Sequence, residues 1–238
     1  LHEEADRVRN FAEKNQVLIE CGGVGGSYGN LALGGDAAVW LCGVKMALVE
    51  AYRNPQFIHR LLDIIHTWDI MRIRIVLNTG CADVIGHRGW YEGAFFSARL
   101  YKRFIAPMIH EEAELVHKAG AKFGYIITRN ILPLLGLLKE TGIDIIWGVD
   151  PVQDDMDLAI VKDKAGDICL WGGVNSYVTL LQTDEEIKMS VCKAIECLAP
   201  GGGFILSAVD AVLDEIPSEG LRSMIEVWRE FAEYPYIH

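Results

Sequence analysis

One pattern recurs along most of this sequence: a short apolar run, a loop that carries a polar residue, and an amphipathic helix. The segments KETGIDIIWGVD and KDKAGDICLWGGV show it most clearly, because both pass from a helix end through Gly and Asp into an apolar run. Apolar runs that lack alternation and are bounded by turn residues are typical of buried parallel strands. The pattern therefore predicts a chain of βα units with a parallel sheet.

Six such units can be counted. The expected strands are residues 17–21, 83–86, 121–127, 143–149, 167–172 and 204–208. The expected helices are residues 31–52, 55–78, 98–119, 132–141, 156–165, 183–198 and 217–234. A doubly wound sheet and a (β/α)8 barrel both accommodate this alternation. A barrel needs eight strands, so a barrel interpretation implies that this chain supplies only part of one.

Composition excludes several classes of function. The 238 residues carry a formal net charge of -11 without a Lys/Arg cluster, which argues against a nucleic-acid surface. The six cysteines form no CxxC pair, as expected for buried thiols in a reducing compartment. No apolar stretch is long enough to span a bilayer, and the charged first helix does not resemble a signal peptide. We expect a cytoplasmic protein without membrane or nucleic-acid partners.

Polar residues at the predicted strand exits are the candidate site residues, because βα folds build their sites at the carboxyl ends of strands. The candidates for catalysis are Asp210, Glu20 and Asp150. The candidates for substrate binding are Arg88, Trp90, Arg129, Asn130, Asn175 and Tyr28.

Each candidate also has a structural interpretation. Asp150 and Asp210 are equally suited to cap a turn or a helix, and Asn130 is placed to be an N-cap. Two arginines at strand exits, Arg88 and Arg129, point more directly to an anion or a carboxylate partner. His87 competes with Arg88 for the inward direction, because neighbouring residues of a strand point to opposite faces.

Cofactor motifs are missing from the sequence. The glycine-rich loop GGVGGSYGN lacks a GxGxxG in a βαβ setting and is not followed by a suitably spaced acid for a ribose. Neither an HxH nor an HxC zinc pattern occurs, and no serine lies in a nucleophile elbow. We therefore predict no metal site and no cofactor bound by this chain.

Several segments together resemble the uroporphyrinogen decarboxylase superfamily, which includes the methylcobamide:coenzyme M and other corrinoid-dependent methyltransferases. These segments are CADVIGHRGW, SARLYKRFIAPMI, KFGYIITRNILPLLGLLKETGIDIIWGVDP, LWGGVN and GGGFILSAVDAVLDEIPSEGLRSMIE. The resemblance covers about residues 17–234 and lies in their order and spacing. It implies a single (β/α)8-type barrel domain over residues 1–238, to which this chain supplies the last six βα units.

The resemblance also shows departures from the family pattern. The positions that hold zinc in the methyltransferases correspond to Ile126, Thr128 and Asp210. The side chain of Ile126 has no atom that can bind a metal. Asp210 also replaces the histidine that the decarboxylases have at the last strand. A tyrosine of the family's earlier glycine-containing loop corresponds to Tyr28 or is replaced by Asn30.

Three functions follow as hypotheses. The favoured one is a corrinoid-linked methyltransferase or demethylase acting on a methylated small molecule. The corrinoid would come from a partner protein, because no DxHxxG motif occurs here. The second is uroporphyrinogen decarboxylation in porphyrin biosynthesis, and the third is a non-catalytic or fragmentary binding member. A sheet with two open edges predicts a homodimer or another chain that completes the barrel.

Overall fold

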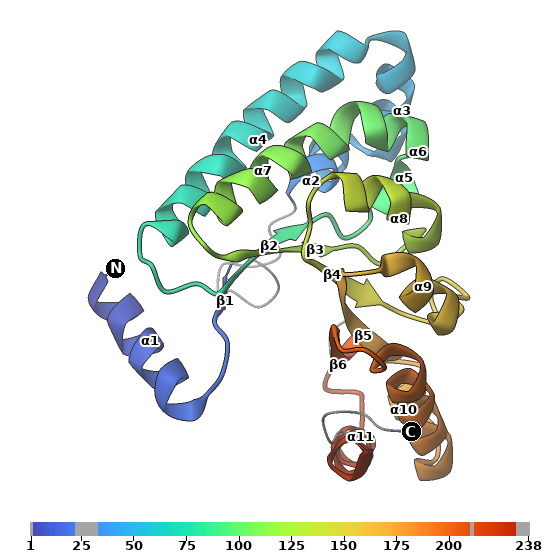
Figure 1. Cartoon of the computed structure of the whole chain (residues 1–238). Helices are drawn as coiled ribbons and strands as arrows, with labels where there is room; N and C mark the ends of the chain where they lie inside the picture. The colour runs from blue at the N-terminus through green and yellow to red at the C-terminus, as the bar shows by residue number, and fades with distance from the viewer. Residues whose placement is uncertain (1, 22–32, 210–211, 232–238) are drawn as a thin grey trace. The chain divides into compact units, whose positions relative to one another are not determined.

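The computed structural model describes residues 2–21, 33–209 and 212–231 (Figure 1). The chain divides into two compact units. The first contains residues 1–129 and 136–144, and the second contains residues 130–135 and 145–238. The expected single domain over 1–238 stays a prediction.

Three parallel strands form the sheet of the first unit: β1 (Glu20–Cys21), β2 (Val84–Arg88) and β3 (Lys122–Ile126). Their register places Glu20 beside Val84, His87 beside Tyr125 and Arg88 beside Ile126. The helices of this unit are α1 (His2–Asn15), α2 (Gly34–Cys42), α3 (Val44–Arg53), α4 (Pro55–Leu77), α5 (Glu92–Phe95), α6 (Ala98–Leu100) and α7 (Ala106–Lys118). α8 (Ile131–Glu140) has residues in both units.

Local sequence explains where the longest helix starts and what it packs against. The Asn54 side chain accepts a hydrogen bond from the backbone N–H of Phe57, and Pro55 occupies the first turn of α4, where a missing N–H costs nothing. α4 and α7 lie side by side in Figure 1, and His66 of α4 hydrogen-bonds to both Glu111 and Glu112 of α7.

The second unit has three more parallel strands in chain order: β4 (Ile145–Val149), β5 (Cys169–Asn175) and β6 (Phe204–Val209). Its helices are α9 (Leu158–Ala165), α10 (Asp184–Leu198) and α11 (Ser218–Phe231). A capping box starts α10, because the side chains of Thr183 and Glu186 each accept from the other residue's backbone N–H.

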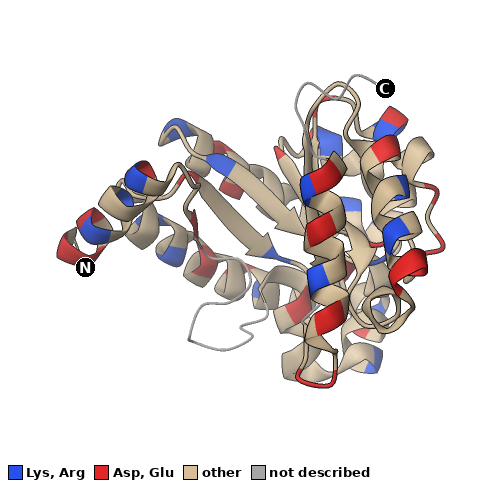
Figure 2. Cartoon of the chain, turned by 90° about the horizontal axis from the view of Figure 1, so that it is seen from below, with Lys and Arg blue, Asp and Glu red and all other residues tan. Residues whose placement is uncertain are grey.

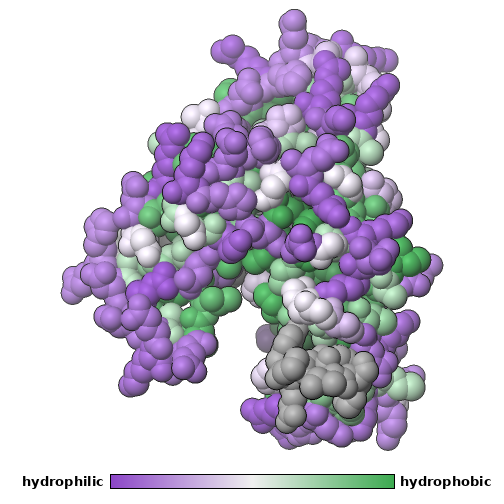
Figure 3. Space-filling view, in the orientation of Figure 1, coloured by the Kyte–Doolittle hydropathy of each residue, from purple (hydrophilic) through white to green (hydrophobic). Residues whose placement is uncertain are grey.

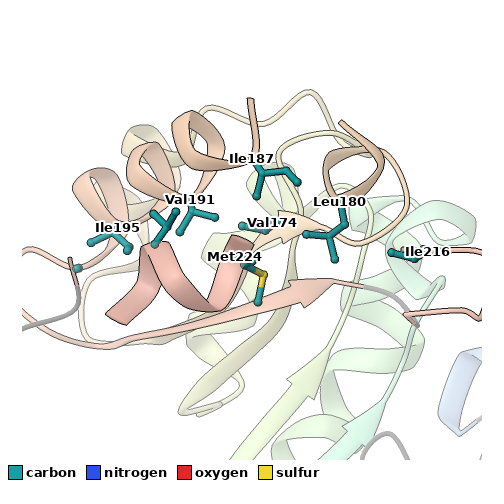
Figure 4. Packing of buried hydrophobic residues seen from close by; sticks show 9 residues of the cluster. Val174, Leu180, Ile187, Val191, Ile195, Ile216 and Met224 are labelled. Carbon is teal, nitrogen blue, oxygen red and sulfur yellow. The ribbon is translucent and has the colours of Figure 1, made fainter. Parts of the chain in front are cut away.

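The core of the second unit lies between its strands and its last two helices (Figure 4). Ile187, Val191 and Ile195 recur at helical spacing along α10 and pack with Val174 of β5 and Met224 of α11. Since Val174 faces these helices, alternation along β5 directs Trp171 to the opposite face of the sheet.

The observed elements differ from the expected ones mainly at their ends. β2 and β5 continue to Arg88 and Asn175, which the sequence patterns place in loops after shorter strands. The expected helix over 31–52 is broken at Gly43, whose φ of 81° favours glycine. The expected helix over 98–119 contains a π-helical turn at Tyr101–Ile105, just before Pro107, a residue that cannot donate to the Arg103 carbonyl.

Charged side chains are concentrated outside the strands. In Figure 2 the strand arrows are tan over nearly all their length, while red and blue segments cover the helices. α1, the charged first helix, is largely hydrophilic on the face shown in Figure 3, and its Arg9 pairs with Asp83 at 3.0 Å. No helix within the described ranges has both the length and the apolar character needed to cross a bilayer.

Candidate functional site

The last two residues of β2 point to opposite faces of the sheet. Nδ1 of His87 lies 2.6 Å from a carboxylate oxygen of Glu112 in α7, so His87 faces the helices. Arg88 therefore faces the other side, which is the interior side in a βα barrel. There its guanidinium carbon lies 5.0 Å from the ring centroid of Trp90. The competition between His87 and Arg88 for the inward direction is resolved in favour of Arg88.

Backbone hydrogen bonds join the exits of β2 and β3. The carbonyl of Trp90 accepts from the backbone N–H of Thr128 at 3.1 Å and from its hydroxyl at 2.9 Å. The N–H of Gly89 donates to the carbonyl of Ile126 at 3.1 Å. Arg88, Trp90 and Arg129 consequently lie on two joined segments, as expected for residues of one site.

Other candidates of the first unit lie elsewhere. Glu20 is beside Val84, the first residue of β2, so it lies about 13 Å along the strand direction from Arg88. The structure does not bring Glu20 to the strand end. Tyr28 and Asp210 lie outside the described residues.

Asp150 and Asn175 meet at the ends of β4 and β5. Oδ2 of Asp150 accepts from Nδ2 of Asn175 at 2.7 Å, and Oδ1 accepts from the backbone N–H groups of Val152 and Gln153 at 2.8 and 3.2 Å. Both side chains are buried. Asp150 thus performs the turn-capping role and also contacts a second candidate residue, and its catalytic role stays a prediction.

Asn130 precedes α8 and has a φ of 55°, a left-handed conformation that asparagine tolerates better than most residues. The first N–H of α8, that of Ile131, donates to the Asp154 carboxylate at 3.2 Å. Asn130 is therefore set at a turn, and its role in substrate binding stays a prediction.

A pair of tryptophans on the strand face opposite the helices was not predicted as part of the site. Trp147 of β4 and Trp171 of β5 stack with ring centroids 4.1 Å apart and an interplanar angle of 3°. Both rings are half-buried. The repeated βα pattern contained the signal, because both tryptophans occupy the same place in the segments KETGIDIIWGVD and KDKAGDICLWGGV.

A buried polar network behind β2 was also missed. The Glu112 carboxylate lies within hydrogen-bond distance of both His87 and His66, at 2.6 and 3.2 Å. Glu92, fully buried at the start of α5, accepts from the Tyr125 hydroxyl and from the N–H of Gly35. These groups come from six elements, so no sequence spacing indicated that they would meet.

The network shifts the pKa of its members. Burial would lower the pKa of His87, but the carboxylates of Glu112, Glu92 and Asp69 together outweigh burial and raise it to about 9. Burial would raise the pKa of Glu112, but His87 and His66 together lower it to about 2. His87 is therefore a cation paired with an anion at neutral pH. Burial, with a contribution from Glu92, raises the pKa of Asp36 to about 7.

We expect the free energy of unfolding to fall as the pH rises from 7 to 9. The pKa of His87 is higher in the folded chain than the usual 6.5, so its contribution is complete below pH 6.5 and is lost as the pH passes 9. One such proton gives a slope of at most about 1.4 kcal/mol per pH unit. Urea unfolding at several pH values measures this slope. The variant His87→Gln should flatten it, and an unchanged slope in that variant would contradict the assignment.

Two of the three positions that the family resemblance relates to zinc ligands, Ile126 and Thr128, are poorly suited to hold zinc. Ile126 has no donor atom, and the hydroxyl of Thr128 is already bonded to the Trp90 carbonyl. In the part of the chain that the structure describes, no group of three or more His, Cys, Asp or Glu side chains is arranged to hold a metal ion.

Comparison with known proteins identifies the family. The family model described as uroporphyrinogen decarboxylase matches residues 36–231, which is most of the chain. The chain belongs to the uroporphyrinogen decarboxylase family. This membership confirms the resemblance drawn from the sequence segments and the α/β fold of the TIM-barrel type.

Solved structures agree with the family fold. A methyltransferase from Methanosarcina mazei matches with a TM-score of 0.75 and 20% identity, over 96% of this chain and 64% of that chain. A B12-independent methionine synthase from Shewanella sp. W3-18-1 matches with a TM-score of 0.60 and 11% identity, over 96% of this chain and 66% of that chain. This chain thus spans just under two thirds of the length of either protein. A comparison with curated protein sequences returned no match.

Proposed function

We propose that this member of the uroporphyrinogen decarboxylase family is a corrinoid-linked methyltransferase or demethylase that acts on a methylated small molecule. The proposal is carried by one observation, the aromatic and acidic character of the strand ends in the second unit. The stacked Trp147 and Trp171 lie on the face opposite the helices, and the hydrogen-bonded Asp150 and Asn175 lie at the ends of the same two strands.

Charge in the adjoining loops supports this substrate class. The loops that follow β4, β5 and β6 (residues 150–157, 176–183 and 210–217) contain seven Asp or Glu residues and no Lys or Arg. A porphyrinogen with many carboxylates would require cations in such loops. Aromatic faces beside carboxylates instead suit an uncharged or cationic methylated compound.

The proposed reaction moves a methyl group from oxygen or nitrogen of the substrate to a reduced corrinoid carried by a partner protein. The electron pair of the broken bond stays on the heteroatom, which then takes up a proton. In the second unit we assign substrate orientation to Asn175, with the tryptophan pair as an apolar wall. Proton delivery falls to Asp210.

Decarboxylation is the second candidate, favoured by the description of the family model. Arg88 and Arg129, on the joined exits of β2 and β3, are the two cations that could hold substrate carboxylates. Two parallel assays distinguish the reactions. In one, the protein is incubated with methoxylated compounds or methylated amines and a reduced corrinoid protein. In the other, it is incubated with uroporphyrinogen. Methyl transfer changes the corrinoid absorbance. Carbon dioxide release from uroporphyrinogen, with an unchanged corrinoid spectrum, would refute the favoured function.

We expect Trp171→Ala to lower kcat/KM for the methylated substrate at least tenfold, mainly through KM, because it removes half of the stacked pair. The control is Trp228→Ala in α11, a more exposed tryptophan remote in sequence from the strand ends. Steady-state kinetics with melting curves of both variants test this. Equal losses of activity in the two variants would remove the tryptophan pair from the site.

A further inference from the structure

Helix α4 has two apolar faces, and only one of them serves the core. The buried face consists of Ile58, Leu62, Ile65, Ile70 and Ile73. The second face forms a seam along the helix, made of Phe57, Leu61, Ile64, Trp68, Met71 and Ile75.

Within the described residues most of the seam is uncovered, and only Leu61 is half-buried. Ile64, Met71 and Ile75 are 63%, 56% and 53% exposed, and Phe57 and Trp68 are also exposed. Single exposed apolar residues are common on protein surfaces and need no explanation. A continuous row over about 27 Å of one helix is different, because a surface helix normally carries one apolar stripe and a polar outer face.

Spacing along the seam identifies the kind of surface that fits it. Successive members are separated by 4, 3, 4, 3 and 4 residues. This is the heptad pattern by which one α-helix packs along another, with an average repeat of 3.5 residues. The seam is therefore matched to a helix rather than to a strand or a small molecule.

Charge at the edges of the seam distinguishes between possible helices. Three arginines border it, Arg60 and Arg74 on one side and Arg72 on the other, and no acidic residue occupies a bordering position. Arg72 also lies 3.8 Å from the Asp69 carboxylate of the same helix. Arg72 lies over the Trp68 ring, with its guanidinium carbon 4.8 Å from the ring centroid. Two copies of α4 packed along this seam would bring arginines near one another, although the chain as a whole carries a net charge of -11.

From the heptad spacing and the arginine borders, we propose that the α4 seam docks an amphipathic helix of a partner protein whose apolar stripe is flanked by Asp and Glu. The docking surface lies on a different face of α4 from the one buried in the unit. It is independent of the proposed function, and its test does not use enzymatic activity.

A pair of synthetic peptides tests the proposal on the full chain. Both peptides have four heptads with Leu at the two apolar positions, and they carry either Glu or Lys at the flanking positions. Glu at every flank also prevents the acidic probe from pairing with itself at neutral pH. Isothermal titration calorimetry should show binding of the Glu peptide at least tenfold tighter than that of the Lys peptide. Equal affinities, or no binding of the Glu peptide, would overturn the proposal.

Substitutions on α4 test whether the Glu peptide binds at the seam. The double variant Ile64→Ser with Met71→Ser should weaken binding of the Glu peptide at least tenfold, whereas Met189→Ser, an equally exposed methionine on α10, should leave it unchanged. The double charge reversal Arg60→Glu with Arg74→Glu should reverse the preference between the two peptides. Melting curves establish that the variants are folded. If sedimentation shows a dimer that the double serine variant dissociates, the occupant is a second copy and the acidic partner is refuted.

Discussion

The variant Glu112→Gln is expected to lose about 3 kcal/mol of unfolding free energy, because it removes one member of a buried ion pair. The Glu112 carboxylate is almost fully buried and contacts the imidazoles of both His87 and His66. Glutamine has nearly the same shape but no charge, so it leaves the cationic His87 buried without its nearest counterion. Urea unfolding followed by circular dichroism at pH 7 measures the loss.

The neighbouring residue provides the control. Glu111 also contacts His66, with 3.0 Å between Oε2 and Nε2, but its side chain is 64% exposed. Exposed pairs of this kind contribute about 0–1 kcal/mol, so Glu111→Gln should change stability very little. Equal losses in the two variants would show that general charge in α7, and not the buried pair, stabilises the unit.

The second large effect is expected from Gly93→Ala. A Cβ atom at residue 93 would lie 2.0 Å from the backbone carbonyl oxygen of Arg129 and 2.9 Å from Cδ1 of Ile127. A carbonyl of the main chain cannot rotate away as a side chain can, so the joined exits of β2 and β3 must move apart. We expect a loss of about 3 kcal/mol in unfolding free energy, in the range of severe overpacking.

Gly136→Ala is the matched glycine substitution. Gly136 lies inside α8, and a Cβ atom there meets no atom within 4 Å. Alanine favours a helix interior over glycine by about 1 kcal/mol, so this variant should be slightly more stable. Thermal melting of the two variants gives shifts of opposite sign if the crowding at Gly93 is real. Similar shifts would show that the β2 and β3 exits can relax.

The sequence predicted which helices and strands form better than it predicted the residues at which they end. Apolar runs located the six strands that the structure describes. A strand that is buried on both faces of the sheet is apolar along its whole length, and such a run is visible in a short stretch of sequence. The ends of β2 and β5 were missed, since Arg88 and Asn175 are polar residues in strand conformation at the carboxyl ends of the strands. The pairing of Asp150 with Asn175 agrees with the expectation that exits of neighbouring parallel strands meet.

The buried network could not be predicted from the sequence, and the reason is physical. Glu92 and Glu112 are 20 residues apart and come together only when α5, α7 and β2 are assembled. Charged residues on predicted helices are normally assigned to solvent, so nothing local distinguishes Glu112 from the exposed Glu111. The family resemblance succeeded for another reason, because the order of several weak segments carries information that no single motif contains.

The tether between the exits of β2 and β3 has a consequence for how this protein can change over evolutionary time. The carbonyl of Trp90 is held by the backbone N–H and the hydroxyl of Thr128, and the carbonyl of Arg129 packs against Gly93. None of these contacts uses the side chains of Arg88, Trp90 or Arg129. Those three side chains can therefore be exchanged while the supporting backbone keeps its path, so the chemistry at these strand exits can vary between related sequences without rebuilding the loops.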